Sequence, residues 1–322
     1  MNTLMPLHVH TPTWESRPLS AALDALVLLK MEALQPTGSF KIRGIGHACQ
    51  VSCEAGANRL VCSSGGNAGY AVAYAGRKLG VGVTVVVPKT TPNWMRETIR
   101  QENAAVIEHG ESWDDSHAYA SELAGQDGTA YIHPFDDPRI WSGHASIIEE
   151  IAHDGLKPDA VVLSVGGGGL LCGVLEGLHR VGWTGIPVIA AETEGAASFA
   201  ASVEAGRLIT LDKIASVATT LGARTVASEA LAWTHRHIIM PWKVSDRTAV
   251  DACIRFADDH RILVEPACGA ALSAIYNRAS LLAGLKRVMV IVCGGAGVSL
   301  SLLREWDRRV GTKHYEPNHS PY

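Results

Sequence analysis

Short apolar runs rich in β-branched residues alternate with Ala-rich stretches along most of the chain. The runs predict strands at residues 26–31, 59–62, 82–88, 104–108, 160–165, 188–192 and 288–293. Helices are predicted between several of them, at residues 67–79, 91–101 and 170–178. Because the apolar positions within the strands are continuous rather than alternating, both faces of each sheet should be covered. This pattern is typical of doubly wound α/β structure.

Three of the predicted strands lead directly into loops rich in glycine and serine. These loops are residues 63–69, 166–169 and 294–297. In open α/β sheets, ligands bind beyond the carboxyl ends of the strands. The sequence therefore predicts that these three loops contribute to one ligand site.

The loop at residues 166–169 consists of four consecutive glycines and precedes a predicted helix. Its free backbone N–H groups can converge on an anion at a helix N-terminus, where the helix dipole adds to the attraction. The alternative is a tight turn that needs positive φ angles. The spacing does not match GxGxxG and no Walker Lys-Ser/Thr pair follows, so we expect a phosphate but neither a dinucleotide nor ATP.

Lys41 lies at a predicted helix start, among apolar residues and two positions before Arg43. In this setting, desolvation and the helix dipole would disfavour its charged form. A lysine with a lowered pKa can act as a Schiff-base amine or a general base. The alternative is a lysine on a solvated helix face beside Arg43.

Two further segments carry candidate site residues. The loop Ser63-Ser64-Gly65-Gly66-Asn67-Ala68-Gly69 offers hydroxyls, backbone donors and one amide, which suit a carboxylate and a phenolic oxygen. Its residues are also typical of N-caps and turns. Cys293, at the end of a predicted strand, is a weak neutral donor that could face a ring nitrogen, although most buried cysteines only pack.

Composition narrows the class of protein. With 322 residues, of which 47% are hydrophobic and 19% charged, the chain can form two domains or one large α/β unit. Its 28 basic and 32 acidic residues give a net charge of −4 without a basic stripe, so nucleic acid is not an expected partner. We also expect no signal peptide and no membrane span. Seven scattered cysteines without a CxxC motif indicate a reducing compartment, so we expect a cytoplasmic protein.

Taken together and in this order, the motifs resemble those of the serine/threonine dehydratases of the mammalian type, which are fold-type II pyridoxal-phosphate enzymes with a tryptophan synthase β-like fold. The resemblance covers nearly the whole chain. Its motifs are SFKIRG (39–44), SSGGNAG (63–69), HPFDDP (133–138), SVGGGGLLCGV (164–174), LVEPACGAAL (263–272) and VIVCGG (290–295).

The resemblance implies a role for each candidate residue. Lys41 would carry pyridoxal phosphate on its amine, with Phe40 beside the ring, Asn67 on the ring hydroxyl and Cys293 on the pyridine nitrogen. The phosphate would bind to the backbone of Gly166, Gly167, Gly168, Gly169 and Leu170, and the substrate carboxylate to Ser64, Gly65, Asn67 and Ala68. At position 65 related enzymes carry Ala or Gly, so substrate preference stays open.

A monovalent cation near the glycine loop is also implied by the resemblance. Glu192 and Ser198 would supply side-chain ligands, and Gly166, Ala196, Leu221 and Ala223 would supply carbonyl ligands. Such hard oxygen donors suit an alkali cation such as K⁺. The alternative for Glu192 is a helix-capping or surface role.

The resemblance further implies two α/β domains with the active site between them: a large cofactor domain (1–31 plus 139–322) and a small domain (32–138). The expected activity is β-elimination and deamination of L-serine and also of L-threonine, with Lys41 as the base and the cofactor phosphate as the acid for the β-hydroxyl. A homodimer is implied. The end of the chain soon after the last motif suggests a catabolic role without feedback. Alternatives are a serine racemase, a threonine synthase or a β-replacement enzyme of the same fold, or a binding protein without activity.

Overall fold

The computed structural model describes residues 5–311. The strands are β1 (Thr13–Glu15), β2 (Leu26–Lys30), β3 (Arg59–Cys62), β4 (Gly82–Val87), β5 (Ala105–Glu108), β6 (Thr129–Tyr131), β7 (Ala160–Ser164), β8 (Val188–Thr193), β9 (Ile239–Val244) and β10 (Arg287–Ile291). The α-helices are α1 (Arg17–Leu23), α2 (Lys41–Glu54), α3 (Asn67–Leu79), α4 (Asn93–Gln101), α5 (Trp113–Leu123), α6 (Pro138–His153), α7 (Gly169–Arg180), α8 (Ser198–Ala205), α9 (Ser228–Ala232), α10 (Asp246–His260), α11 (Pro266–Tyr276) and α12 (Leu300–Val310).

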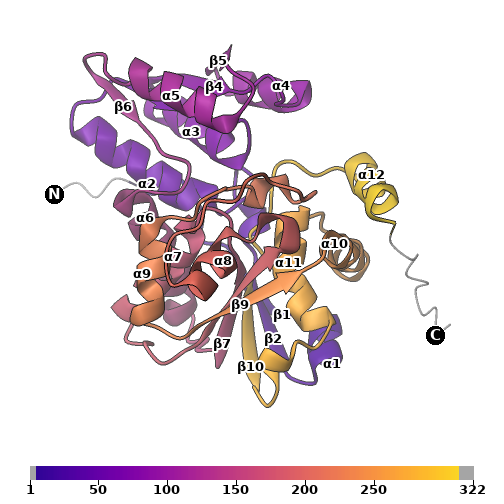
Figure 1. Ribbon diagram of the computed structural model, residues 1–322. Helices are drawn as coiled ribbons and strands as arrows, with labels where there is room; N and C mark the ends of the chain where they lie inside the picture. The colour runs from indigo at the N-terminus through magenta and orange to yellow at the C-terminus, as the bar shows by residue number, and fades with distance from the viewer. Residues whose placement is uncertain (1–4, 312–322) are drawn as a thin grey trace.

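The strands form two sheets. The larger sheet has six strands in the order β1-β2-β10-β7-β8-β9, and all its pairs are parallel except β1 with β2. The smaller sheet has four parallel strands in the order β5-β4-β3-β6. Figure 1 shows the four-stranded sheet at the top and the six-stranded sheet below it. The structure therefore shows which strands belong to each sheet. The domain limits at 31/32 and 138/139 stay a prediction.

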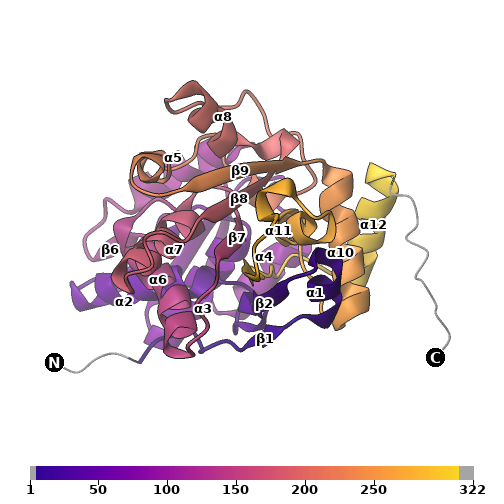
Figure 2. The same ribbon diagram turned by 90° about the horizontal axis from the view of Figure 1, so that it is seen from below.

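Helices cover the sheets and join them. The helix α2 packs against α3 of the upper part and against α6, which in turn packs against α7. In Figures 1 and 2 these helices lie together on one side of the molecule, whereas α10 and α12 lie on the opposite side. The core strand β7 is buried along its whole length, as the continuous apolar pattern predicts. The doubly wound α/β architecture expected from the sequence is confirmed.

The three strands that pattern analysis missed are all at sheet edges. Strands β1 and β6 have only three residues each, and β9 contains Pro241 and is mostly half-buried. Edge strands have one neighbour and need no continuous apolar run, so they leave little pattern in the sequence. The predicted strands and helices differ from the observed ones by two residues or fewer at each end.

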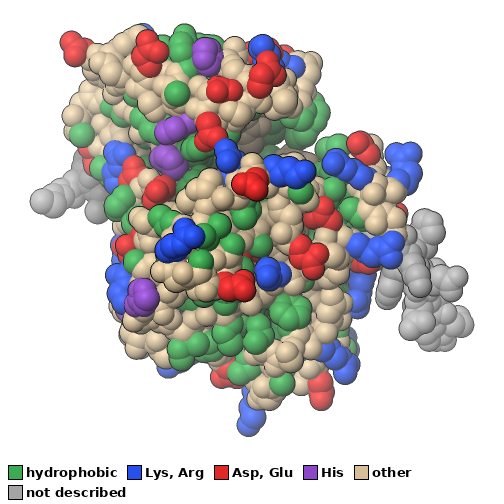
Figure 3. Space-filling view, viewed as in Figure 1, with side chains coloured by type: hydrophobic (Ala, Val, Ile, Leu, Met, Phe, Trp, Pro, Cys, Tyr) green, Lys and Arg blue, Asp and Glu red, His purple; other side chains and the backbone are tan. Residues whose placement is uncertain are grey.

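Within residues 5–311 no helix is both long enough and apolar enough to cross a membrane. On the face shown in Figure 3, acidic and basic side chains are interspersed rather than gathered by sign. Histidine side chains gather on this face where the upper and lower parts meet.

Candidate active site

The segment before Lys41 is joined to the loop that follows β10. The Phe40 N–H donates to the Cys293 carbonyl (3.1 Å), and the Gly295 N–H donates to the Gly38 carbonyl (2.8 Å). Between these two hydrogen bonds, Ser39 and Gly294 form an isolated antiparallel bridge. Two motifs that lie about 250 residues apart in the sequence therefore meet at the start of α2.

Lys41 is the first residue of α2, as predicted. Its amine donates to the Pro134 carbonyl (2.7 Å) and lies 5.2 Å from the centre of the Phe40 ring. Burial lowers the pKa of Lys41 to about 8, and the thiols of Cys62 and Cys293 oppose this shift only in part. Of the two sequence interpretations, the solvated surface lysine is thus excluded.

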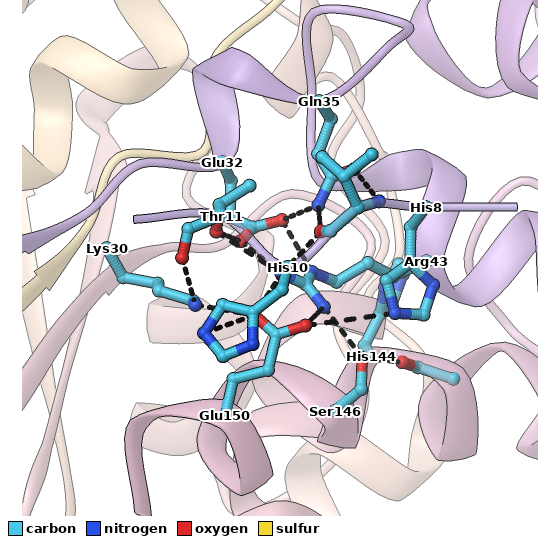
Figure 4. A network of polar contacts seen from close by, with 12 residues as sticks. His8, His10, Thr11, Lys30, Glu32, Gln35, Arg43, His144, Ser146 and Glu150 are labelled. Atoms are coloured by element: carbon cyan, nitrogen blue, oxygen red, sulfur yellow. Dashed lines mark hydrogen bonds and ion pairs between the residues drawn. The ribbon is translucent and has the colours of Figure 1, made fainter. Parts of the chain in front are cut away.

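Arg43 is close to Lys41 in the sequence, but its guanidinium is bound in a separate ion network. Figure 4 shows its guanidinium between two carboxylates. It donates to Glu32 (2.7 and 2.8 Å) and to Glu150 (2.6 and 2.7 Å). Lys30 donates to the same Glu150 (2.5 Å). Because these carboxylates balance the positive charge of Arg43, the lowered pKa of Lys41 comes from burial, as the sequence predicted, and not from the neighbouring guanidinium.

The four-glycine loop forms the start of α7. Gly168 is the N-cap with a φ of 91°, and it is the only one of the four with a positive φ. The other three are glycine for lack of space: a Cβ at Gly166 would lie 3.0 Å from Leu221 Cα and one at Gly169 would lie 2.7 Å from the Phe135 carbonyl oxygen. A Cβ at Gly167 would collide with the Phe135 ring. A simple turn accounts for one glycine but not for four.

Phe135 also connects this loop to Lys41. It follows Pro134, whose carbonyl accepts from the Lys41 amine, while its own carbonyl accepts from the Trp141 indole (2.8 Å). The turn before it is held by His133, whose Nδ1 accepts from the N–H groups of Phe135 (3.2 Å) and Asp136 (2.7 Å). The buried amine and the glycine cradle therefore lie on either side of one short segment. A group with an aldehyde at one end and a phosphate at the other fits this arrangement.

The loop Ser64–Ala68 leads into α3. Gly66 is the N-cap and Asn67 the first helical residue, and the Ser64 hydroxyl accepts from the Gly66 N–H (3.3 Å). Ala68 is buried, and at Gly65 a Cβ would lie within 2.6 Å of the Thr91 methyl group. The Asn67 side chain does not cap α3 but turns toward the large sheet, where its Oδ1 accepts from the Ala296 N–H (2.8 Å).

Cys293 lies two residues beyond the end of β10 and is buried. A hydrogen bond with the Cys268 side chain, together with burial, raises the pKa of the Cys293 thiol well above its ordinary value. Cys293 therefore carries a neutral thiol at neutral pH. Its place beside Phe40 and Lys41 is set by the hydrogen bond from the Phe40 N–H to its carbonyl.

The predicted cation ligands come from two neighbouring segments. Glu192 is in β8, Ala196 ends the short helix η2 (Glu194–Ala196) and Ser198 begins α8. Glu192 accepts from the N–H groups of Phe199 (2.9 Å) and Ala200 (2.8 Å), so it does cap α8, and burial raises its pKa to about 7. The second segment includes the helix η3 (Thr219–Leu221) and Ala223. This second segment lies against the glycine loop, because Leu221 closely approaches Gly166.

Sequence reasoning missed Glu265. It was noted only as part of the LVEPACGAAL stretch, yet its carboxylate is buried and accepts from Asn67, Thr220 and the Gly297 N–H. The available signal was an acidic residue inside an otherwise apolar stretch, since such residues are almost never fully buried without partners.

The fold is that of an α/β enzyme with two sheets, and the geometry of the site suits a phosphorylated aldehyde bound between the Lys41 amine and the glycine loop. Comparison with known proteins agrees. Residues 4–294 match the model of the family described as "Pyridoxal-phosphate dependent enzyme". The chain belongs to this family, and its fold is the fold-type II architecture.

Several relatives match almost from end to end. The chain is 49% identical to the human L-serine dehydratase/L-threonine deaminase, over 97% of this chain and 98% of that protein. It is 48% identical to the mouse serine dehydratase-like protein, over 95% and 96%. Among solved structures, the L-serine ammonia-lyase of Rhizomucor miehei superposes with a TM-score of 0.90 at 39% identity, covering 95% of this chain and 99% of that one. Maize serine racemase superposes with a TM-score of 0.86 at 25% identity, over 95% and 93%.

Proposed function

We propose that this protein converts L-serine to pyruvate and ammonia, and L-threonine to 2-oxobutanoate and ammonia. The observation that carries the proposal is the Lys41 amine, which is buried next to the glycine cradle across the Pro134-Phe135 segment. Its lowered pKa supplies a neutral amine near physiological pH. The near end-to-end similarity to proteins named as serine dehydratases and serine ammonia-lyases identifies the substrate class.

The chain's own residues divide the chemistry among them. When bound, pyridoxal phosphate serves as an electron sink for the α-carbon of the amino acid. Lys41 then takes the α-proton, the Cβ–O bond breaks, and the hydroxyl leaves as water after it gains a proton. The released enamine tautomerises and is hydrolysed to the keto acid and ammonia. Lys41 therefore acts first as the attachment point and then as the base.

Two other features favour elimination. The loop Ser64–Ala68 places backbone donors at the start of α3, where the helix dipole attracts a substrate carboxylate. Cys293 would face the pyridine nitrogen with a neutral thiol, which leaves that nitrogen unprotonated and the ring a weaker sink. A weaker sink disfavours a long-lived carbanion and so favours prompt loss of the β-hydroxyl over racemisation or transamination.

Purified protein loaded with pyridoxal phosphate tests the proposal. With L-serine as the only substrate and no added nucleophile, pyruvate and ammonia should appear in equal amounts. The Lys41→Ala variant should lose at least about a thousandfold in rate, because it lacks both the attachment amine and the base. Chiral chromatography of the same reaction measures D-serine. Racemisation faster than pyruvate release would refute the proposal in favour of a racemase. Conversion of L-serine only with an added thiol, to a thioether amino acid without pyruvate, would refute it in favour of a β-replacement enzyme.

We further propose that the Glu192 segment binds a monovalent cation such as K⁺. The Ser198 hydroxyl is buried and lacks a hydrogen-bond partner among the described residues, next to a carboxylate whose only donors are two N–H groups. Within residues 5–311, Glu192 has no direct ion pair, although Lys243 on the neighbouring strand attracts it. A buried carboxylate without such a pair is unfavourable, and a bound cation would offset that cost. Activity should rise when Na⁺ is replaced by K⁺ at constant ionic strength. Ser198→Ala should abolish this difference, whereas Ser301→Ala, on the exposed start of α12, should not.

A further inference from the structure

The carboxylate of Glu265 connects three segments of the site. Glu265 lies just before α11 and is 3% exposed. Its Oε2 accepts from the Thr220 hydroxyl (2.8 Å) and from Asn67 Nδ2 (3.1 Å), and its Oε1 accepts from the Gly297 N–H (2.6 Å). Asn67 begins α3 beside the small sheet, whereas Thr220 and Gly297 belong to the large part. One buried carboxylate thus links the two halves of the site.

This carboxylate decides which way the Asn67 amide faces. Asn67 Oδ1 accepts from the Ala296 N–H, which can only donate, and Asn67 Nδ2 faces Glu265, which when ionised can only accept. The amide therefore cannot be turned round without two unfavourable contacts. Nδ2 lies 3.1 Å from Oε2 and 3.3 Å from Oε1, so one of its two hydrogens is shared between the carboxylate oxygens. The other hydrogen diverges from the first and cannot reach the same carboxylate. The second N–H is left for another acceptor.

The loop after β10 is shaped around Glu265. A Cβ at Gly295 would collide with the Glu265 carboxyl carbon, and one at Gly297 would lie 2.6 Å from Oε1. Gly295 also has a φ of 147°, a conformation that other residues rarely adopt. The same loop carries Cys293, which is predicted to face the pyridine nitrogen. The position of Glu265 therefore affects Cys293 as well as Asn67, which is predicted to face the ring hydroxyl.

We propose that Glu265 is a positioning residue: it fixes the Asn67 amide so that its free N–H faces the phenolic oxygen of bound pyridoxal phosphate. The proposal rests on the proposed function and on the role that the family resemblance implies for Asn67, whose amide would contact that oxygen. Glu265 touches neither the α-carbon nor the Lys41 amine in this role. Its influence passes through Asn67.

The isosteric variant Glu265→Gln separates orientation from packing. The Gly297 N–H can only donate, so it keeps the carbonyl oxygen of the new amide, whereas the Thr220 hydroxyl can rotate to accept. The NH₂ group must then take the place of Oε2, against Asn67 Nδ2, and the Asn67 amide loses its fixed orientation. In the loaded protein we expect the visible absorption band of bound pyridoxal phosphate to fall by at least about half in favour of the near-ultraviolet band. The affinity for the cofactor should weaken about tenfold, as expected for a lost hydrogen bond to a charged group.

The double variant Asn67→Asp/Glu265→Gln provides the decisive control. It exchanges donor and acceptor, so positions 67 and 265 can bond again and the Ala296 N–H keeps its acceptor. The melting temperature should recover from that of Glu265→Gln, but the band should not, because an acceptor now faces the phenolic oxygen. Recovery of both would show that Glu265 only joins the segments, and would overturn the proposal. Glu102→Gln, which removes a carboxylate paired with the surface residue Arg77, should leave band and affinity unchanged.

The outcomes separate this inference from the proposed function. Borohydride reduction and peptide mass spectrometry of the wild-type protein should locate the cofactor on Lys41, and failure there would refute the proposed function. A wild-type protein that carries the cofactor on Lys41, with an unchanged band in Glu265→Gln, would refute only the role of Glu265. If Glu265→Gln does not fold, Glu265→Asp replaces it. That variant keeps the charge but withdraws it from Asn67, and the same spectral loss is expected.

Discussion

Lys41 and Arg43 are two residues apart in the first turn of α2, yet the protein treats their charges in opposite ways. Arg43 is fully buried and bonded to Glu32 and Glu150, and Lys30 balances the second carboxylate. Two positive and two negative groups are thus paired. Burial alone would lower the pKa of Arg43, but the two carboxylates overcome this and hold it above its ordinary value.

Among the residues that the structure describes, Lys41 has no such partner. Its amine meets the Pro134 carbonyl, the Phe40 ring and the neutral thiols of Cys62 and Cys293, and its pKa falls to about 8. Burial raises the pKa of Cys62 to about 12, so that thiol offers no countercharge either. The difference shows how a helix start can be fixed by a saturated ion network while the adjacent amine is kept neutral for chemistry.

The largest effect should come from breaking the network. Arg43→Met leaves the carboxylate of Glu32 buried with only Thr11 and Gln35 as donors. We expect the free energy of unfolding of the cofactor-free protein to fall by about 3–5 kcal/mol. Lys41→Met, by contrast, removes an uncompensated charge, so stability at pH 7 should stay the same or rise. Denaturant titrations of the two variants measure both values.

A matched surface variant calibrates this prediction. Arg77 pairs with Glu102 but is 38% exposed, so Arg77→Met should lower the free energy of unfolding far less than Arg43→Met does. If Arg43→Met were no more harmful than Arg77→Met, the network could not be what fixes the start of α2.

The sequence predicted the environment of Lys41 but not that of Arg43. The apolar neighbours of Lys41 and its place at a helix start predicted a desolvated amine correctly. The partners of Arg43 could not be found, because Glu150 lies 107 residues away and nothing local marks it. The same holds for Glu265 and Asn67, which are 198 residues apart. Local patterns predict which segments form strands and loops, but not which side chains meet after folding.

The glycine loop shows the same limit. Its four glycines predicted an anion cradle, and the strand-loop-helix context was right. The sequence did not reveal that Phe135 packs on two of them, because the contact depends on how the segment before α6 crosses the start of α7. The turn around His133 and the N-cap at Asp137 fix that crossing.

A second prediction concerns the packing of the glycine loop, and its expected effect is smaller. In Gly167→Ala the new methyl group would collide with the Phe135 ring, which must move. Overpacking of this kind costs about 1–3 kcal/mol. We expect affinity for pyridoxal phosphate, measured by fluorescence titration, to weaken about tenfold or more, with little change in the Arg43 network. Gly185→Ala, in the turn after α7, has open space around its Cβ and should bind the cofactor as the wild type does. Equal affinities for Gly167→Ala and the wild type would exclude the loop as the phosphate cradle.

The smallest effect follows from the pKa of Lys41. Only the neutral amine attacks an aldehyde, so the rate at which the cofactor-free protein captures pyridoxal phosphate should rise with pH and level off above about 8. Between pH 7 and pH 8 the neutral fraction rises about fivefold, as follows from a single titration at that pKa. The same pKa predicts how stability depends on pH. The pKa of Lys41 in the folded protein lies below the unfolded value of 10.5, so between about pH 8 and 10.5 the unfolded chain binds more protons than the folded protein. The free energy of unfolding should therefore increase as the pH rises through that range. Stopped-flow absorbance at constant ionic strength measures the capture rate. A rate that keeps rising tenfold per unit up to pH 10 would mean that Lys41 is as solvated as a surface lysine, and the distinction from Arg43 would rest on geometry alone.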